Sequence, residues 1–169
     1  MDIRPAIESD ALGVAKVHVY TWQAVYRGVV PDSYLESLSV SNRESVWRES
    51  IVKGSPELWV AESNSKIVGW AAFGPSRDGD ADGTVGELEA IYVIPSFWKK
   101  GLGRRLWLTA RRRMVERGFT SATLWVLRDN PRAIQFYRAA GFNEDKASEK
   151  EIVRAGQKLR EVRYAASLS

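Results

Sequence analysis

Residues 87–106 of this chain read ELEAIYVIPSFWKKGLGRRL. The first part is strand-like and is closed by Pro95, and the last part begins a helix rich in basic residues. Gly101 and Gly103 lie at the junction, where glycine permits a positive φ and lets a ligand approach the backbone N–H groups. Free N–H groups at a helix start, together with the helix dipole, form a site for an anion such as a pyrophosphate. The basic residues beside this site are Lys99, Lys100, Arg104 and Arg105.

Spacing alone leaves more than one interpretation of this loop. A P-loop would need Gly-Lys-Ser/Thr at a fixed distance after its first glycine, and the stretch has none. A dinucleotide-binding fingerprint would need a third glycine where Leu106 stands. A pyrophosphate cradle of another type and a plain loop at the start of a helix both remain.

Outward from this loop, the chain alternates between strand and helix patterns. The helix predicted from Gly103 to Arg117 has its apolar residues spaced by four, at 102, 106, 110 and 114. Residues 144–160 are rich in Glu, Lys, Ala and Arg, so local propensity predicts a helix there. The other predicted elements are strands at 3–5, 58–62, 66–73, 85–94 and 122–127, and helices from Ser9 or Asp10 to Tyr26, from Pro31 to Leu38, from Ser41 through Ile51 and from Pro131 to Ala140.

A second motif, NPRAIQFYRAAGF at residues 130–142, follows the strand at 122–127. Together the two motifs resemble those of the GNAT superfamily of N-acetyltransferases. In that family an Arg/Gln-x-x-Gly-x-Gly/Ala loop precedes, by about thirty residues, the pattern Asn-x-x-Ala-x-x-Phe/Leu-Tyr-x-x-x-Gly-Phe. The opening Ile-Arg-Pro-Ala at 3–6 and the helix end at 22–28 are also typical, so the resemblance covers essentially the whole chain.

The resemblance implies a fold and a co-substrate. It implies one α/β (α+β) domain over residues 1–169, with a mixed, mostly antiparallel central sheet and helices on both faces. It replaces the predicted helix at 144–160 by a strand after Phe142, a turn at Ala155-Gly156 and a last strand at 160–166. It also implies acetyl-CoA, with its pyrophosphate on the N–H groups of residues 99–104 and its pantetheine arm along the first of two splayed central strands. The expected coenzyme-binding residues are Ile91, Tyr92, Val93, Trp98, Lys99, Lys100, Gly101, Leu102, Gly103, Arg104, Arg105, Asn130, Ala133, Phe136 and Tyr137.

Two positions depart from the family pattern. Trp98 stands where the loop usually opens with Arg or Gln, a position thought to act mainly through its backbone N–H. Trp125 stands where some relatives carry a catalytic Glu, and an indole cannot accept a proton. The first change weakens the motif, and the second removes one version of the mechanism.

Three residues are candidates for acid–base chemistry. The resemblance gives Tyr137 the role of general acid that protonates the departing thiolate, while the alternative is an ordinary core aromatic. Glu87 and Glu89 share one face of their strand if no bulge intervenes. Either carboxylate could take the proton that an acceptor ammonium must lose before it attacks a thioester. Glu87 matches the base position of histone-type relatives in the family, counted back from Gly101, and Glu89 is the second candidate. The alternative for this pair is a solvated strand edge.

The acceptor side is marked by aromatic and acidic residues. Trp22, Tyr26 and Tyr34 come from the region that lines the acceptor site in the family, although all three also suit a core. His18, among apolar neighbours on the first long helix, is interpreted as structural. The acidic residues Asp78, Asp80, Asp82, Glu87 and Glu89 follow one another without an intervening Lys or Arg, and their field favours a cationic amine.

Composition narrows the function classes. The chain has no Cys, which excludes disulfides, thiolate zinc sites and a cysteine nucleophile, and with one His a multi-histidine metal site is excluded too. We therefore expect no metal. The charged N-terminus and the lack of ~18 consecutive apolar residues predict a cytoplasmic protein without a membrane partner. Nothing in the sequence decides the oligomeric state, and a homodimer stays open.

The function predicted from these observations is acetyl transfer from acetyl-CoA to a primary amine of a small molecule or peptide, by direct attack. A catalytically silent acyl-CoA sensor on the same fold is one alternative. The other is a nucleic-acid-binding protein, because residues 99–117 hold eight Lys or Arg against one acid. No aromatic residues interleave with these basic residues in the manner of a single-strand binder, so we expect no nucleic-acid partner.

Overall fold

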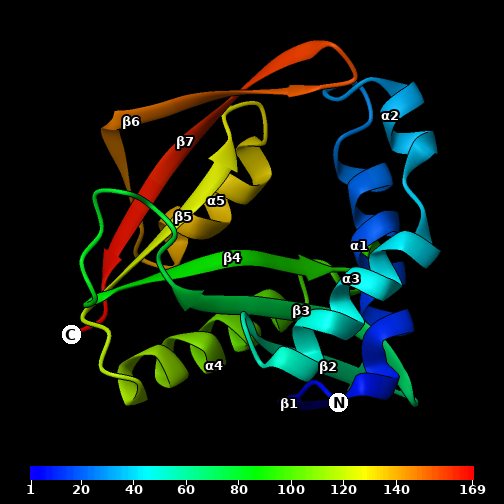
Figure 1. Cartoon of the computed structure of the whole chain (residues 1–169), viewed down its shortest axis with the longest axis horizontal. Helices are drawn as coiled ribbons and strands as arrows, with labels where there is room; N and C mark the ends of the chain where they lie inside the picture. Colours follow the sequence, from blue (N-terminus) through cyan, green and yellow to red (C-terminus); the bar gives the residue numbers. More distant parts are fainter.

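The computed structural model describes residues 1–146 and 148–169, and in this part of the chain it shows one seven-stranded sheet (Figure 1). The strand order is β1-β2-β3-β4-β5-β7-β6, and all neighbours are antiparallel except β4 and β5. The strands are β1 (Asp2–Pro5), β2 (Glu57–Ser63), β3 (Lys66–Pro75), β4 (Val85–Val93), β5 (Ser121–Leu127), β6 (Asn143–Arg154) and β7 (Gln157–Ser167). The α-helices are α1 (Ala11–Val25), α2 (Asp32–Ser37), α3 (Val40–Lys53), α4 (Leu102–Glu116) and α5 (Pro131–Ala139). The mixed sheet implied by the resemblance is confirmed.

Helices cover both faces of the sheet, as expected (Figure 1). On one face α4 packs its predicted apolar stripe, and residues 102, 106, 110 and 114 are all at most 2% exposed. On the other face α1 and α3 pack around Trp70, whose indole N–H donates to the Val14 carbonyl at 3.1 Å. β3 lies between the two layers, and its residues 68–74 are buried on both sides. The centre of the sheet is therefore a rigid platform for whatever the neighbouring strands carry.

The start of α3 differs from the prediction. The sequence predicts the cap at Ser41, but the N-cap is Ser39, whose hydroxyl accepts the Asn42 N–H at 3.1 Å. Both serines suit a cap, and the helix begins at Val40, directly after the earlier one. The sequence signal at this position was ambiguous by half a turn.

The tail forms a hairpin, so the helix that local propensity predicts for residues 144–160 is wrong and the strands implied by the resemblance are confirmed. Ala155 and Gly156 have φ values of 48° and 78°, the signs that a tight two-residue turn requires. β5 also pairs along its whole length, from Ser121 to Leu127, with residues 161–167 of β7. These long-range pairs outweigh the local helix preference of the Glu- and Lys-rich segment.

β4 and β5 pair only at their beginnings. The parallel register covers Val85 with Ser121, Gly86 with Ala122 and Glu87 with Thr123. Beyond these pairs β4 continues to Val93 and β5 to Leu127, and the two strands do not pair with each other again. The splayed central strands that the resemblance implies are therefore confirmed, and a gap opens in the sheet directly after Glu87 (Figure 1).

Candidate active site

The edge of β4 that faces this gap offers free backbone groups. Ile94, next after β4, donates its N–H to the Val68 carbonyl of β3 at 3.0 Å. Because alternate residues of a strand direct their N–H and C=O groups to opposite sides, Ile91 and Val93 direct theirs into the gap. The Val93 carbonyl already accepts the Trp98 indole N–H at 2.6 Å. The Val93 N–H and the backbone of Ile91 are thus left for a ligand.

The loop between β4 and α4 presents a row of unpaired N–H groups. Lys99 and Gly101 are both left-handed, with φ of 58° and 79°. In the described part of the chain none of the N–H groups of residues 99–104 donates a hydrogen bond, and the first helical bond runs from the Arg105 N–H to the Gly101 carbonyl. A row of N–H groups at the start of a fifteen-residue helix fits an anion such as a pyrophosphate.

Replacing Gly101 by Val is expected to weaken coenzyme A binding by at least tenfold. A Cβ at Gly101 meets no protein atom within 4 Å, so the branched side chain would occupy the space in front of the N–H groups. Gly118 is the matched control, because it also has a positive φ (88°) and open space but lies at the other end of α4. Both variants should lose about 1–2 kcal/mol of stability from the left-handed backbone. Calorimetry with coenzyme A would contradict the assignment if both variants bound it like the wild type.

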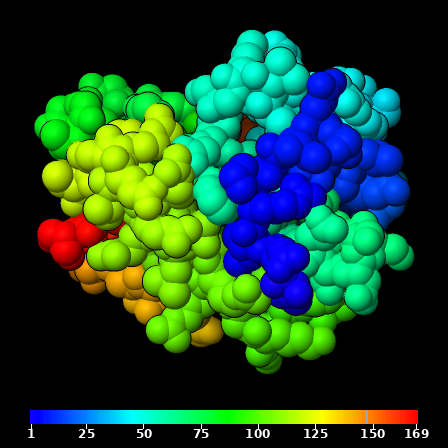
Figure 2. Space-filling model, turned by 90° about the horizontal axis from the view of Figure 1, so that it is seen from below, coloured from blue at the N-terminus to red at the C-terminus, as the bar shows by residue number. Residues whose placement is uncertain are grey.

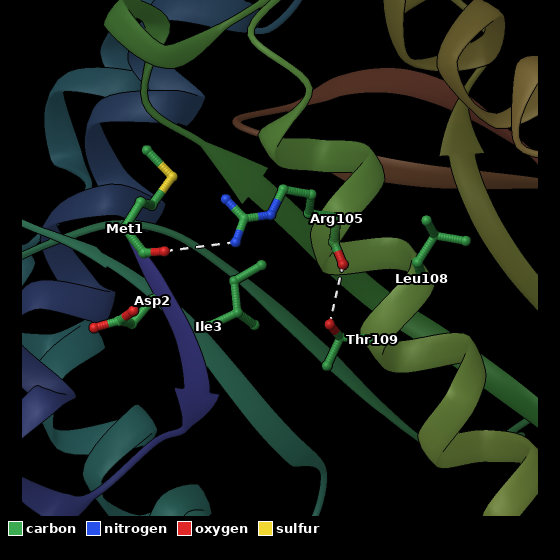
Figure 3. Close-up of a pocket in the computed structure, with 6 residues that line it drawn as sticks. All are labelled: Met1, Asp2, Ile3, Arg105, Leu108 and Thr109. Atoms are coloured by element: carbon green, nitrogen blue, oxygen red, sulfur yellow. Dashed lines mark hydrogen bonds between the residues drawn. The ribbon is translucent and has the colours of Figure 1, made fainter.

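The four basic side chains near the loop are not all directed toward it. Arg105 donates instead to the Met1 carbonyl at 3.5 Å, across a hollow of about 490 Å³ lined by both residues (Figure 3). Figure 2 shows the N-terminal residues, in dark blue, forming the surface beside α4. Lys100 lies 5.3 Å over the Phe97 ring, and Lys99 and Arg104 are exposed. The structure thus places the Arg105 guanidinium beside β1, while the side chains of Lys99, Lys100 and Arg104 remain exposed.

α5 is anchored at its first residue and packed closely on α4. Asn130 caps the helix, with its Oδ1 accepting the Ala133 N–H at 3.2 Å, while its Nδ2 donates to the Tyr26 hydroxyl at 3.4 Å. Phe136 lies so close to Gly103 that a Cβ there would be 3.1 Å from the ring. The motif residues 130, 133 and 136 therefore set the position of α5 against the loop, and Leu102 is buried in the core beneath it.

Tyr137 is half-buried, and its ring packs against Phe136 and Phe142. Burial and the nearby Tyr26 phenol raise the pKa of Tyr137 above its usual range. Burial is also the main cause that raises the pKa of Tyr92, which lies on β4, with the phenols of Tyr26 and Tyr137 adding to the effect. The three phenols thus lie close enough to interact. No group in the described part of the chain bonds to the Tyr137 hydroxyl, while Thr21 carries the only described polar side-chain atom that is both fully buried and unpaired. The Tyr137 hydroxyl therefore keeps access to the space around it.

Glu87 and Glu89 meet at one guanidinium. A bulge shifts the register, with Ala72 opposite Ala90 but Phe73 opposite Leu88, so that Glu89 is the extra residue. Arg77 nevertheless contacts both carboxylates. It binds Glu87 through its backbone N–H (3.3 Å), its Nε (2.7 Å) and its Nη2, and its Nε lies 3.3 Å from Glu89. The prediction that Glu87 and Glu89 share a face required β4 to have no bulge, and β4 has one. The two carboxylates still lie on the same side, because Arg77 contacts both.

The Glu87 and Glu89 carboxylates differ in their exposure and in the number of contacts that hold them. The Glu87 side chain is only 2% exposed and is held by Arg77, whereas the Glu89 side chain is 18% exposed and has one contact with that residue. Burial raises the pKa of Glu89, and Arg77 partly opposes this. Glu89 also lies beyond the last β4–β5 pair, at the gap itself. Of the two, Glu89 is better placed to accept a proton.

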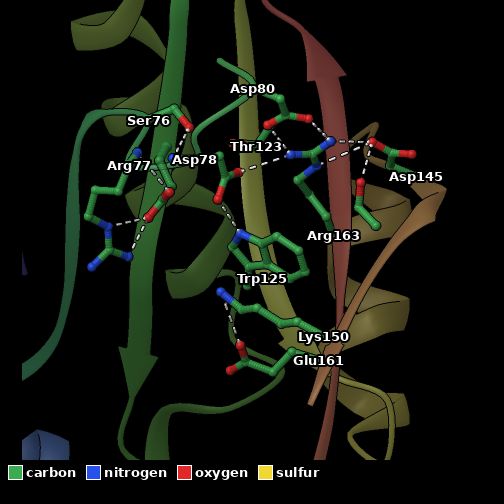
Figure 4. A network of polar contacts seen from close by, with 12 residues as sticks. Ser76, Arg77, Asp78, Asp80, Thr123, Trp125, Asp145, Lys150, Glu161 and Arg163 are labelled. Atoms are coloured by element: carbon green, nitrogen blue, oxygen red, sulfur yellow. Dashed lines mark hydrogen bonds and ion pairs between the residues drawn. The ribbon is translucent and has the colours of Figure 1, made fainter. Parts of the chain in front are cut away.

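The acidic loop between β3 and β4 is tied to the far strands (Figure 4). Asp78 accepts the Trp125 indole N–H at 2.9 Å, and Arg163 of β7 pairs with Asp78, Asp80 and Asp145. Lys150 lies 3.9 Å over the Trp125 ring and is paired with Glu161 at 3.7 Å. Counting the Arg77 pairs, this acidic cluster has five carboxylates (Asp78, Asp80, Glu87, Glu89 and Asp145) against two guanidiniums (Arg77 and Arg163), a net charge of −3.

The aromatic residues expected at the acceptor side form a connected group. The Trp22 ring lies 4.4 Å from the Tyr26 ring and 6.2 Å from the Tyr34 ring, between centroids. The Trp22 indole N–H also donates to the Tyr92 hydroxyl of β4 at 2.9 Å. Tyr26 is buried in a cluster with Leu127 and Leu159, while Trp22 and Tyr34 are half-buried. The structure therefore brings all three toward the gap, with Tyr26 the most enclosed.

His18 lies among Trp22, Trp47, Trp70 and Tyr92, and its Nδ1 accepts the Trp47 indole N–H at 3.0 Å. Burial, with a smaller effect of Arg43, lowers the pKa of His18 to about 4. The ring is neutral and supports the aromatic cluster. These contacts agree with the structural interpretation.

Acid should destabilise the fold through His18. Its unfolded pKa is about 6.5, so between pH 6.5 and 4 the unfolded chain binds a proton that the folded chain does not. The free energy of unfolding should therefore fall by up to about 3 kcal/mol as pH drops through this window. The measurement is denaturant unfolding at pH 7 and pH 4.5, with His18→Gln as the comparison. An equal loss in both proteins would assign the acid sensitivity to other groups.

Two arginines of the site were missed by the sequence reasoning. Arg77 stands one residue before the acidic run that was examined, and Arg132 lies inside the second motif at a position with no assigned role. The available signal for Arg132 was its spacing of four from Phe136, which puts both on one face of a helix. Nothing in the sequence indicates the pairing of Arg77 with Glu87.

The described residues include no cluster of His, Asp or Glu arranged to hold a metal ion. No described helix is both long and apolar enough to span a bilayer.

Known proteins resemble this chain in both sequence and fold. The family model described as Acetyltransferase (GNAT) family matches residues 19–142. The uncharacterized N-acetyltransferase YuaI of Bacillus subtilis is 34% identical over 161 residues, covering 95% of this chain and 89% of that protein. A spermidine N(1)-acetyltransferase of Thermoplasma acidophilum is 26% identical, covering 84% and 88%. The crystal structure of the PaiA N-acetyltransferase from Thermoplasma acidophilum, in complex with coenzyme A, has the same fold, with a TM-score of 0.79 at 20% identity and 98% of each chain covered.

Proposed function

The chain belongs to the acetyltransferase (GNAT) family, and we propose that it moves the acetyl group of acetyl-CoA directly onto a primary amine. The observation that supports this proposal is the gap after Glu87, which leaves a strand edge of β4 unpaired, with the Glu89 carboxylate beside it. Burial raises the pKa of Tyr92 of β4, and the Tyr137 phenol is near enough to raise it further. A cysteine acetyl-enzyme is excluded because the sequence contains no Cys.

The residues of the chain supply binding and proton transfer. The N–H groups of residues 99–104 hold the pyrophosphate, and the backbone of Ile91 and Val93 pairs with the pantetheine amides. The thioester supplies the activated acetyl group. Glu89, with Glu87 as the second candidate, takes a proton from the acceptor ammonium so that the nitrogen lone pair can attack. As the new C–N bond forms and the C–S bond breaks, Tyr137 gives its proton to the departing sulfur.

Charge supports a cationic acceptor. The acidic cluster beside Glu89 carries a net charge of −3, and its field draws an amine with more than one positive charge toward the site. A polyamine has this chemistry, and one relative is named as a spermidine N(1)-acetyltransferase. We therefore propose a polyamine-like amine as the first acceptor class.

One observation favours a second class, an acceptor that carries a carboxylate. Arg43 is half-buried and has no carboxylate partner in the described part of the chain. It lines a hollow of about 190 Å³ together with Tyr34, next to the aromatic group that reaches β4. A guanidinium there could hold the carboxylate of an amino acid while Glu89 receives its ammonium.

An acceptor screen that follows release of free thiol from acetyl-CoA tests the proposal. Spermidine, single L-amino acids and a peptide with a free N-terminus are compared in the wild type and in Arg43→Gln. Spermidine turnover that is unchanged in the variant supports the first class, and amino-acid turnover lost in the variant supports the second. Coenzyme A binding without turnover of any amine would contradict the proposal and favour an acyl-CoA sensor.

The nucleic-acid alternative is weakened by the contacts of α4. Arg113 pairs with Glu57 at 2.9 Å, and Arg117 pairs with the same carboxylate at 3.4 Å. Arg112 lies 3.9 Å from Glu116, and Arg111 donates to the Leu168 carbonyl at 3.0 Å. Much of this positive charge is therefore engaged within the protein. Salt-sensitive binding of a DNA duplex by the purified chain would revive the alternative.

A further inference from the structure

Arg132 is held in place by stacking and not by an ion pair. Its Cζ lies 3.2 Å from the centroid of the Trp98 ring. The indole is itself fixed, because its N–H donates to the Val93 carbonyl at 2.6 Å. No carboxylate of the described residues pairs with Arg132. A guanidinium is thus fixed in position by its face, while the N–H groups around its edge have no acceptor among the residues that the structure describes.

Two independent contacts place this guanidinium beside the row of free N–H groups. Arg132 and Phe136 are one helical turn apart on the same face of α5. Phe136 packs on Gly103, inside that row, so Arg132 projects toward the loop that precedes it. Trp98, the residue stacked on Arg132, immediately precedes Lys99, where the row begins.

We propose that Arg132, positioned by Trp98, binds a phosphate group of coenzyme A. A guanidinium edge matches two phosphate oxygens and forms charge-assisted hydrogen bonds with them. The chain has no basic residue at position 98, and Arg132 of α5 adds a positive charge at this end of the loop, beside Lys99 and Lys100. The proposal rests on the coenzyme position given above. The phosphate is either in the pyrophosphate or on the ribose, since both offer the same chemistry.

Calorimetry of coenzyme A binding without any acceptor amine tests the role of Arg132. Arg132→Gln should weaken binding about tenfold, the loss expected from one charge-assisted contact. Arg138→Gln is the matched control, because it removes the same charge from the same helix at a residue that lies near the Tyr164 ring. The affinity of Arg138→Gln for coenzyme A should be unchanged. An unchanged affinity in Arg132→Gln, or an equal loss in the control, would overturn the proposal.

3′-Dephospho-coenzyme A distinguishes the two phosphates. If Arg132 binds the pyrophosphate, Arg132→Gln weakens both ligands equally. If it binds the ribose phosphate, the variant weakens only coenzyme A. Both results support the proposal, and neither depends on acetyl transfer, so a failure of the proposed enzymatic function would be seen separately in the acceptor screen.

The positioning role of Trp98 has its own readout. Trp98→Leu keeps the charge of Arg132 but removes the surface that holds it, so binding should weaken by about threefold, less than in Arg132→Gln. The double variant should bind no more weakly than Arg132→Gln alone, because Trp98 acts through Arg132. Losses that multiply in the double variant would show that Trp98 does not position Arg132.

Discussion

Replacing Tyr137 with Phe is expected to lower kcat by roughly ten- to a thousand-fold while leaving coenzyme A affinity and stability almost unchanged. The change deletes one oxygen atom and retains the ring, which packs between Phe136 and Phe142. The hydroxyl bonds to no described group, so its removal leaves no buried partner unsatisfied. Its loss therefore removes a proton donor without disturbing the packing of α5.

The direction of the pKa shift adds a pH signature. Burial raises the pKa of Tyr137, so the phenol stays protonated well above pH 10, its ordinary midpoint. The wild type should then show no loss of kcat below about pH 10 from ionisation of this group. Tyr20→Phe is the control, because Tyr20 is exposed on α1. Turnover of Tyr137→Phe at the wild-type rate, with saturating acetyl-CoA, would return Tyr137 to a packing role.

Much of the coenzyme side could be predicted from the sequence because it depends on backbone. Glycines with positive φ, a helix start and a strand edge are local features, and residues 91–104 carry all of them. The cap at Asn130 is local too, since its partner is three residues away. The Arg105 side chain could not be placed from the sequence, because its partner, Met1, is 104 residues away.

The acceptor side could be predicted only in part, because its chemistry depends on pairs formed across the sheet. Arg77 binds Glu87 from the loop that follows β3, and Arg163 joins the same acidic loop to β7. The sequence shows that acidic residues gather between positions 78 and 89, but it does not show which of their carboxylates form ion pairs with arginine side chains. The bulge at Glu89 is also invisible, since it arises from the register between β3 and β4. The difference between Glu87 and Glu89 therefore became clear only from the fold.

Glu89→Gln is expected to lower kcat by about a hundred- to ten-thousand-fold and to remove the rise of the rate with pH. A base must be ionised to accept the ammonium proton, so wild-type turnover increases as pH passes the pKa of Glu89. Burial raises that pKa, which places the rise above the ordinary Glu range of about 4.3. Glutamine keeps the shape and cannot take the proton, so coenzyme A affinity should be unchanged.

Two further variants should shift the pH at which the rate rises, and they should shift it in opposite directions. Arg77 lowers the pKa of Glu89, and Glu87 raises it. Arg77→Gln should therefore shift the rise in rate to higher pH. Glu87→Gln should shift it to lower pH, because it removes a neighbouring negative charge and leaves Arg77 to Glu89 alone. These shifts are measured in the pH profile of kcat/KM for one acceptor, and opposite shifts from adjacent charges are difficult to obtain from a general loss of structure.

The double variant Glu87→Gln, Glu89→Gln tests whether either carboxylate acts as the general base. If Glu89 is the base, the double variant behaves like Glu89→Gln, because Glu87 contributes only by tuning the pKa of its neighbour. If Glu87 takes over when Glu89 is absent, the single variant retains a rise with pH that only the double variant loses. A wild-type profile in all three would mean that the ammonium loses its proton to ordered water. The acidic cluster would then serve to attract the cationic acceptor, and a higher salt concentration should raise the acceptor KM with little change in kcat.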